Sequence, residues 1–284
     1  MATAKEIRRR IRTVKNIQKI TNAMKMVAAA RLKKAQARAE AARPYAQKMK
    51  ELMGRLSSSA ACISHPLLER REETNTLFVI IGAERGLAGS YNVNVVHHAL
   101  SEIGGRPVES VKLVLLGRKA ISFFRRRPYQ IVATFESRSS DVAFSDVQRL
   151  TARVRSMFEE REVDAVYLVY SRFVTPMKQV PTTVQLLPME QPATEQKAEG
   201  DFEFEPEASE LLGALLPRYL DTLVYQALIE AQASEQGARM TAMSTATNNA
   251  AEMIETLTLA YNKARQAAIT KELTEIVTSA EALT

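Results

Sequence analysis

The sequence predicts an α/β fold in two parts: a long antiparallel coiled coil of the N- and C-terminal helices, and a central, mainly parallel, Rossmann-like domain. Residues 28–56 and 243–267 each carry small or apolar side chains at spacings of 4 and 3, which is typical of a coiled-coil seam. Because Ala dominates both seams, the two backbones can approach closely, and each seam is the simplest partner for the other. The first seam comprises Ala28, Leu32, Ala35, Ala39, Ala42, Ala46, Met49, Met53 and Leu56, and the second comprises Met243, Ala246, Ala250, Met253, Leu257, Ala260, Ala264 and Ala267.

The N-terminal part, residues 1–58, is predicted to be one helix. Between residues 3 and 56 the only helix breakers are Gly54 and Pro44, so a helix of about 50 residues, roughly 75–80 Å long, is expected, with a bend near Pro44. Its early apolar face is expected to shift around the helix before the Ala-rich seam begins. That face runs through Ile7, Ile11 and Val14, and then through Ile17, Ile20, Met24 and Val27.

The middle part, residues 74–190, is predicted to be the α/β domain. Its apolar, β-branched runs are typical of strands that are buried on both faces of a sheet, and the segments between them have helical periodicity. The expected strands are residues 76–81, 111–116, 130–135 and 164–171, with an edge strand at 182–187, and the expected helices are residues 92–102, 118–124 and 144–161.

Residues 191–206 are predicted to form a polar loop that ends in a short alternating strand, and residues 207–284 the C-terminal helix. That helix would be longer than the N-terminal one. Antiparallel pairing of the two must therefore leave an unpaired overhang, which would carry residues 265–276.

Charge is distributed unevenly along the chain. The net charge is +7, but residues 1–56 hold 16 Lys/Arg against 3 Asp/Glu, whereas residues 207–284 hold 5 Lys/Arg against 10 Asp/Glu. The two ends therefore attract each other, and the remaining positive charge faces nucleic acid, an acidic protein surface or water. No run of 18 apolar residues exists, so no membrane span is expected.

Candidate chemistry is sparse. The turn at residues 82–89, GAERGLAG, follows a strand and precedes a helix, but it matches neither GxGxxG nor GxxxxGK[ST], so a tight turn is favoured over a phosphate-binding loop. The three histidines do not have metal-ligand spacing, and Cys62 is interpreted as a small packed residue. We therefore expect no catalytic residue, no metal and no cofactor in this chain.

Four segments resemble the gamma subunit of bacterial F-type rotary ATP synthases. These are KEIRRRIRTVKNIQKITNAMKMVAAARLKKAQ at residues 5–36, GAERGLAGSYN at 82–92, SEQGARMTAMSTATNNA at 234–250 and YNKARQAAITKELTEIV at 261–277. They occur in the order of the family and together span almost the whole chain.

The resemblance implies a non-catalytic central shaft of a proton-translocating ATP synthase. In the family, the coiled coil lies inside a ring of three alpha and three beta subunits, and the α/β domain forms a foot that binds epsilon and the membrane c-ring. The implied location is peripheral, on the cytoplasmic side of the cell inner membrane, with neither nucleic acid as a partner nor a membrane span.

The resemblance also implies contact residues. Met24 and Lys25 match positions that approach the acidic lever loop of a beta subunit, and Arg239 lies on the facing helix. Arg85 matches an arginine whose role is left open. Ala88 stands where many relatives have Cys, so thiol control is not expected. Contacts with the alpha/beta ring are expected at Arg265, Gln266, Thr270 and Glu272, and contacts with epsilon at Phe202 and Phe204.

Two other functions fit the same sequence features. A coiled-coil scaffold that binds acidic partners would use the basic N-terminal helix, and so would a nucleic-acid binder. The basic helix lacks the interleaved aromatic residues of a single-strand binder and the turn of a helix-turn-helix, which makes nucleic acid the weaker alternative.

Overall fold

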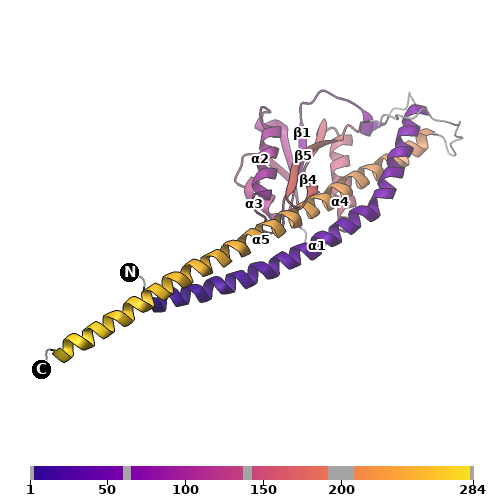
Figure 1. Cartoon of the computed structure of the whole chain (residues 1–284). Helices are drawn as coiled ribbons and strands as arrows, with labels where there is room; N and C mark the ends of the chain where they lie inside the picture. The colour runs from indigo at the N-terminus through magenta and orange to yellow at the C-terminus, as the bar shows by residue number, and fades with distance from the viewer. Residues whose placement is uncertain (1–2, 60–64, 137–142, 191–207, 282–284) are drawn as a thin grey trace. The chain divides into compact units, whose positions relative to one another are not determined.

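The computed structural model describes residues 3–59, 65–136, 143–190 and 208–281. Two long helices, α1 (Ala4–Ser59) and α5 (Ala208–Glu281), stand at the two ends of the chain, and a sheet and three shorter α-helices are described between them in sequence (Figure 1). Both are continuous through an internal proline, Pro44 in α1 and Pro217 in α5. The chain divides into two compact units, residues 1–28 with 239–284 and residues 29–238, so each long helix contributes to both.

The larger unit contains a five-stranded sheet in the order β3-β2-β1-β4-β5. The strands are β1 (Thr76–Ile81), β2 (Val111–Leu116), β3 (Gln130–Phe135), β4 (Ala165–Thr175) and β5 (Lys178–Leu187). The first four are parallel, and β5 pairs antiparallel with β4. This confirms the predicted mainly parallel sheet. The β4–β5 hairpin is longer than expected, because its outer half is exposed and lacks the apolar run that marks a buried strand.

One face of the sheet packs against two short helices, α2 (Tyr91–Ile103) and α3 (Arg118–Phe124). Successive side chains of a strand point to opposite faces, so Phe78 and Ile80 face this layer while Leu77 and Val79 face the other. Phe124 of α3 is completely buried in it. The 3₁₀ turns η1 (Pro66–Leu68) and η2 (Val108–Ser110) precede β1 and β2.

The opposite face packs against α4 (Phe144–Glu159) and against parts of both long helices. Met49 and Met53 of α1 are buried in the same core as Leu216 and Leu220 of α5. The seam predicted over residues 28–56 is confirmed from Ala28 to Met53, since each of these members is buried or half-buried, and the side chain of Leu56 lies outside the described residues. The predicted pairing of this seam with the one at residues 243–267 is wrong. That stretch of α5 forms a unit with residues 1–28 of α1, whereas Met49 and Met53 lie in the core of the α/β domain with Leu216 and Leu220.

In the smaller unit, the buried face of α1 follows an unbroken heptad pattern. The expected shift of this face is wrong: Ile17, Ile20 and Val27 are 47%, 59% and 51% exposed. The residues that are buried or half-buried at spacings of 3 and 4 are Ala4, Ile7, Ile11, Val14, Gln18, Thr21, Lys25 and Ala28. Three consecutive seam positions, Gln18, Thr21 and Lys25, are therefore polar, and a search for apolar residues does not detect them.

The seam of α5 also differs from the prediction, at alternate positions. Met243, Ala250, Leu257 and Ala264 are buried or half-buried as expected, whereas Met253 is 53% exposed. Ala246 is half-buried beside the seam, and Ala260 and Ala267 are exposed. The intervening seam positions are Thr247, Ile254 and Tyr261, each half-buried. At these three positions the prediction selected the preceding residue, Ala246, Met253 or Ala260, because it is smaller or more flexible. Among the described residues, no helix combines the length and hydropathy needed to cross a membrane.

Candidate functional site

The part of α5 from Arg265 onwards is a helix whose described side chains are all exposed. It carries four of the sequence-predicted contact residues, Arg265, Gln266, Thr270 and Glu272. The Thr270 hydroxyl donates to the Gln266 carbonyl oxygen at 3.0 Å, so it stays close to the helix surface. Ile269, Leu273 and Ile276 are exposed on the same segment. This segment therefore combines directional polar groups with an apolar stripe that the described residues of the chain leave exposed.

The other predicted ring contacts are less accessible. Met24 and Lys25 are half-buried in the seam region of α1, while their neighbours Met26 and Val27 are exposed. Arg239 is only 6% exposed. The exposed Met26 and Val27 thus offer a partner more surface than the residues chosen by resemblance. Phe202 and Phe204, the predicted epsilon contacts, lie outside the described residues.

Arg85 is exposed on the turn between β1 and α2, and the first glycine of this turn, Gly82, is required by close packing. Gly117, with φ +87°, approaches the turn so closely that a Cβ atom on it would lie 2.3 Å from the Gly82 carbonyl oxygen. A Cβ on Gly82 would in turn lie 2.8 Å from the Ala120 Cβ. Asn92 Oδ1 accepts a hydrogen bond from the Ala83 amide at 3.1 Å. Close packing against Gly117 and Ala120 therefore accounts for Gly82 and supports the tight-turn interpretation.

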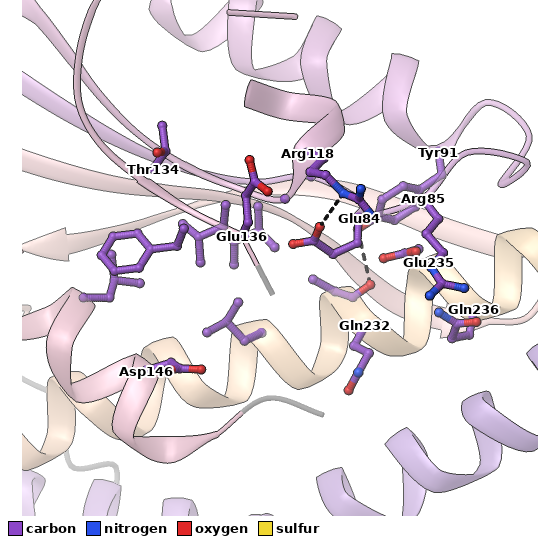
Figure 2. Close-up of a pocket in the computed structure, with 18 of the residues that line it drawn as sticks. Glu84, Arg85, Tyr91, Arg118, Thr134, Glu136, Asp146, Gln232, Glu235 and Gln236 are labelled. Carbon is purple, nitrogen blue, oxygen red and sulfur yellow. Dashed lines mark hydrogen bonds and ion pairs between the residues drawn. The ribbon is translucent and has the colours of Figure 1, made fainter. Parts of the chain in front are cut away.

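A cavity of about 570 Å³ lies beside this turn, at the carboxyl ends of β1, β2 and β3. Figure 2 shows Glu84 next to Arg118, whose Nε is 3.5 Å from the carboxylate, and Tyr91 donates to the Ala231 carbonyl oxygen at 3.2 Å. The charged side chains that line the cavity are balanced between cations and anions, so the cavity does not select for an anion. The cationic members are Arg31, Arg85, Arg118 and Arg149, and the acidic members are Glu84, Glu136, Asp146 and Glu235.

Histidines and carboxylates do not form a metal centre in the part of the chain that the structure describes. His65 instead caps η1, where its Nδ1 accepts from the Leu67 amide at 3.1 Å, and burial lowers its pKa. His98 Nε2 contacts the Thr183 hydroxyl at 3.0 Å. These two histidines therefore have local structural roles.

Sequence reasoning missed two polar groups in helix interfaces. The first is the pair Thr21 and Thr247, whose hydroxyls bond across the two long helices at 2.8 Å. The second is Glu230 of α5, whose carboxylate accepts from the Tyr170 hydroxyl. The sequence signal for the two threonines was their position in a strict pattern of spacings of 3 and 4, which reaches Thr21 from Ile7 and Thr247 from Ala250. For Glu230, it was a lone acid among small and apolar residues.

Comparison with known proteins identifies the family. The family model described as ATP synthase matches residues 3–283. The ATP synthase gamma chains of Desulforamulus reducens and Moorella thermoacetica are each 47% identical, over 284 and 285 residues, with 100% of both chains covered. The gamma chain of Brevibacillus brevis is 43% identical over 280 residues, with 98% of both chains covered.

Solved structures agree with this result. A structure of the central stalk and c-ring of the Tetrahymena thermophila mitochondrial ATP synthase includes a chain that is 28% identical, with a TM-score of 0.61, covering 80% of this chain and 99% of that one. A chain of the Euglena gracilis mitochondrial ATP synthase has the same fold, with a TM-score of 0.70 at 20% identity, covering 99% of this chain and 94% of that one. The chain therefore belongs to the family of ATP synthase gamma chains, the central-stalk component of that enzyme.

Proposed function

We propose that this chain is the rotor shaft of a proton-translocating ATP synthase, and that it couples ion-driven rotation to sequential conformational changes at catalytic sites on the alpha and beta subunits. The observation that carries the proposal is the exposed end of α5. Among the described residues, the part of α5 from Arg265 onwards is a single helix with an exposed apolar stripe. A lone helix in water is marginal, so this segment needs a surrounding partner.

A ring of alpha and beta subunits is the partner that fits this segment. Ile269, Leu273 and Ile276 would slide against an apolar sleeve, since apolar contacts are not directional. Arg265 and Gln266 would make directional hydrogen bonds to a loop of the ring, and Thr270 and Glu272 would add shorter-range contacts. Met24, Lys25 and Arg239 are proposed as contacts nearer the foot.

Asymmetry of the shaft would link rotation to catalysis. A helix with different side chains on each face interacts differently with each of three beta subunits. Each catalytic site would then favour a different conformation. As the shaft rotates, each site would adopt these conformations in turn through a shift in their populations. The chain itself would be non-catalytic, because the chemistry would take place at the alpha/beta interfaces.

The α/β domain would form the foot of the shaft. We propose that it binds epsilon, through Phe202 and Phe204, and the c-ring of the membrane rotor. The chain would then be held peripherally on the cytoplasmic side of the inner membrane.

Truncation of the overhang tests the proposal. A chain that ends at Ala264 keeps the paired part of α5, and a control chain that ends at Ser279 loses only the terminal residues. We expect the first to co-purify with the alpha/beta hexamer but to give less torque and slower proton-driven ATP synthesis than the control, because its bearing is missing. Equal synthesis by the two chains would rule out a coupling role for residues 265–279.

A further inference from the structure

Two threonine hydroxyls meet across the helices of the coiled coil in the unit formed by residues 1–28 and 239–284. Thr21 of α1 and Thr247 of α5 occupy heptad positions of the two seams, and Thr21 is only 8% exposed. Their Oγ1 atoms are 2.8 Å apart, within hydrogen-bonding distance, although the residues are 226 positions apart in the chain. On α1, Thr21 lies between two other polar seam positions, Gln18 and Lys25.

The two hydroxyl protons serve three acceptors. Besides the contact between the hydroxyls, Thr21 Oγ1 lies 3.1 Å from the Gln18 carbonyl oxygen and Thr247 Oγ1 lies 2.7 Å from the Met243 carbonyl oxygen. If Thr247 donates to Thr21, then Thr21 donates to Gln18; if Thr21 donates to Thr247, then Thr247 donates to Met243. In both arrangements one proton bridges the helices and neither hydroxyl is left without a partner.

The apolar seam residues discriminate poorly between registers. With Thr21 opposite Thr247 in an antiparallel pair, Val14 lies opposite Ile254 and Ile7 opposite Tyr261. A slip of one heptad would instead place Val14 opposite Tyr261 and Thr21 opposite Ile254. Val14 would still meet an apolar side chain, whereas both threonine hydroxyls would lose each other and face apolar neighbours.

We propose that the hydroxyl pair of Thr21 and Thr247 stabilises the observed register of α1 against α5, in addition to the packing of both helices in the core of the larger unit. One buried polar pair at a single seam position is an established way to specify coiled-coil register. In the observed register, the start of α1 at Ala4 lies opposite Ala264, which is half-buried, and every described residue after it is exposed. The pair therefore helps to position the overhang, which a slip of one heptad would move by about 10 Å. This inference concerns the chain's own coiled coil and does not depend on rotation.

Disulfide trapping in the full-length chain tests this inference. With Cys62 replaced by Ala, cysteines at positions 14 and 254 report the observed register, and cysteines at 14 and 261 report the slipped one. In a background carrying Thr21→Val and Thr247→Val, we expect the ratio of slipped to native disulfide to rise about two- to tenfold, the range that corresponds to the loss of one net hydrogen bond.

Two controls separate register from general stability. Thr245→Val removes an exposed hydroxyl of the same helix that bonds within α5 to the Thr241 carbonyl oxygen, and it should leave the ratio unchanged. Thr21→Ser with Thr247→Ser keeps both hydroxyls and should preserve the native ratio. The inference is overturned if the valine pair gives the same ratio as Thr245→Val, if both disulfide yields fall together at a constant ratio, or if the serine pair behaves like the valine pair.

Discussion

Glu230 is an acid whose carboxylate is partly removed from water inside the unit formed by residues 29–238. One of its oxygens, Oε2, is buried without a hydrogen-bond partner. Burial raises the pKa of Glu230, although the Tyr170 hydroxyl and the nearby Arg172 and Arg43 act in the opposite direction. Burial, together with the adjacent carboxylate, also raises the pKa of Tyr170 to about 12. The fold therefore disfavours the charged form of Glu230.

Replacement of Glu230 by Gln should make stability less dependent on pH. Because the folded-state pKa lies above the ordinary value of 4.5, the folded chain retains a proton that the unfolded chain has lost. Wild-type stability should therefore fall as pH rises from about 4.5 through the folded pKa, and Glu230→Gln should remove that part of the loss. Urea unfolding at pH 4 and pH 8 measures the difference.

The expected pattern is a variant whose advantage over the wild type is larger at pH 8 than at pH 4. Glu252→Gln, at an exposed position of the same helix, is the matched control and should show no such pattern. An advantage that stayed constant across this pH range would contradict a raised pKa at Glu230.

At the scale of elements, the two long helices are held together by different means along their length. Residues 29–59 of α1 pack into the core of the α/β domain through Met49 and Met53. Residues 4–28 pair with α5 along a heptad seam. Its positions from Ala4 to Val14 are apolar, and those from Gln18 to Lys25 are polar. The second region buries less apolar surface, so its pairing depends more on the individual residues of the seam.

Alanine substitutions at adjacent positions distinguish the observed seam from the predicted one. Ile254 is half-buried, whereas Met253 is exposed. Ile254→Ala should therefore destabilise the pairing of α1 and α5 by about 1–2 kcal/mol, which is below the range for a fully buried Ile. Met253→Ala should change it by less than about 0.5 kcal/mol. Amide hydrogen exchange over residues 243–264 reports both values, and a larger effect of Met253→Ala would restore the predicted seam.

At the scale of the whole molecule, the chain contains one unit with a hydrophobic core and one made of two paired helices. The first is built like an independent α/β domain. The second ends in an exposed helix that lacks an internal partner beyond Ala264 among the described residues. This division is compatible with the central-stalk role of the family.

Reversal of one charge in the overhang should impair coupling without affecting the fold. Arg265 is exposed, so Arg265→Glu should change the free energy of unfolding by no more than about 0.5 kcal/mol. If Arg265 donates charged hydrogen bonds to the ring, proton-driven ATP synthesis should fall by about tenfold. For each variant, ATP synthesis is measured on the assembled complex and unfolding on the isolated chain.

Lys263→Glu provides the matched control for this prediction. It makes the same charge change at an exposed position two residues earlier, on a different side of the helix. An equal loss of synthesis in both variants would point to net charge and would exclude a specific contact at Arg265. Unchanged synthesis in Arg265→Glu would exclude the contact directly.

Several elements were predictable because local pattern and tertiary environment agree. Strands β1 and β2 have the predicted bounds, since a strand buried on both faces needs a continuous apolar run. The overhang followed from the unequal lengths of the helices. Met24, Lys25 and Arg239 could be selected only by resemblance, and their burial depends on neighbours that are distant in the sequence.

The sequence alone determined the family, the mainly parallel sheet and the two long terminal helices, because periodicity and motif order are local properties of the chain. Only the tertiary structure decided which side of each helix is buried. Neighbouring positions of a helix belong to faces that differ by about 100° of rotation, and on α1 the more apolar of two such faces, with Ile17, Ile20 and Val27, is the exposed one. Contact across the helices settled the choice, by placing Thr21 and Thr247 inside the seam and leaving Ile17, Ile20 and Met253 in water.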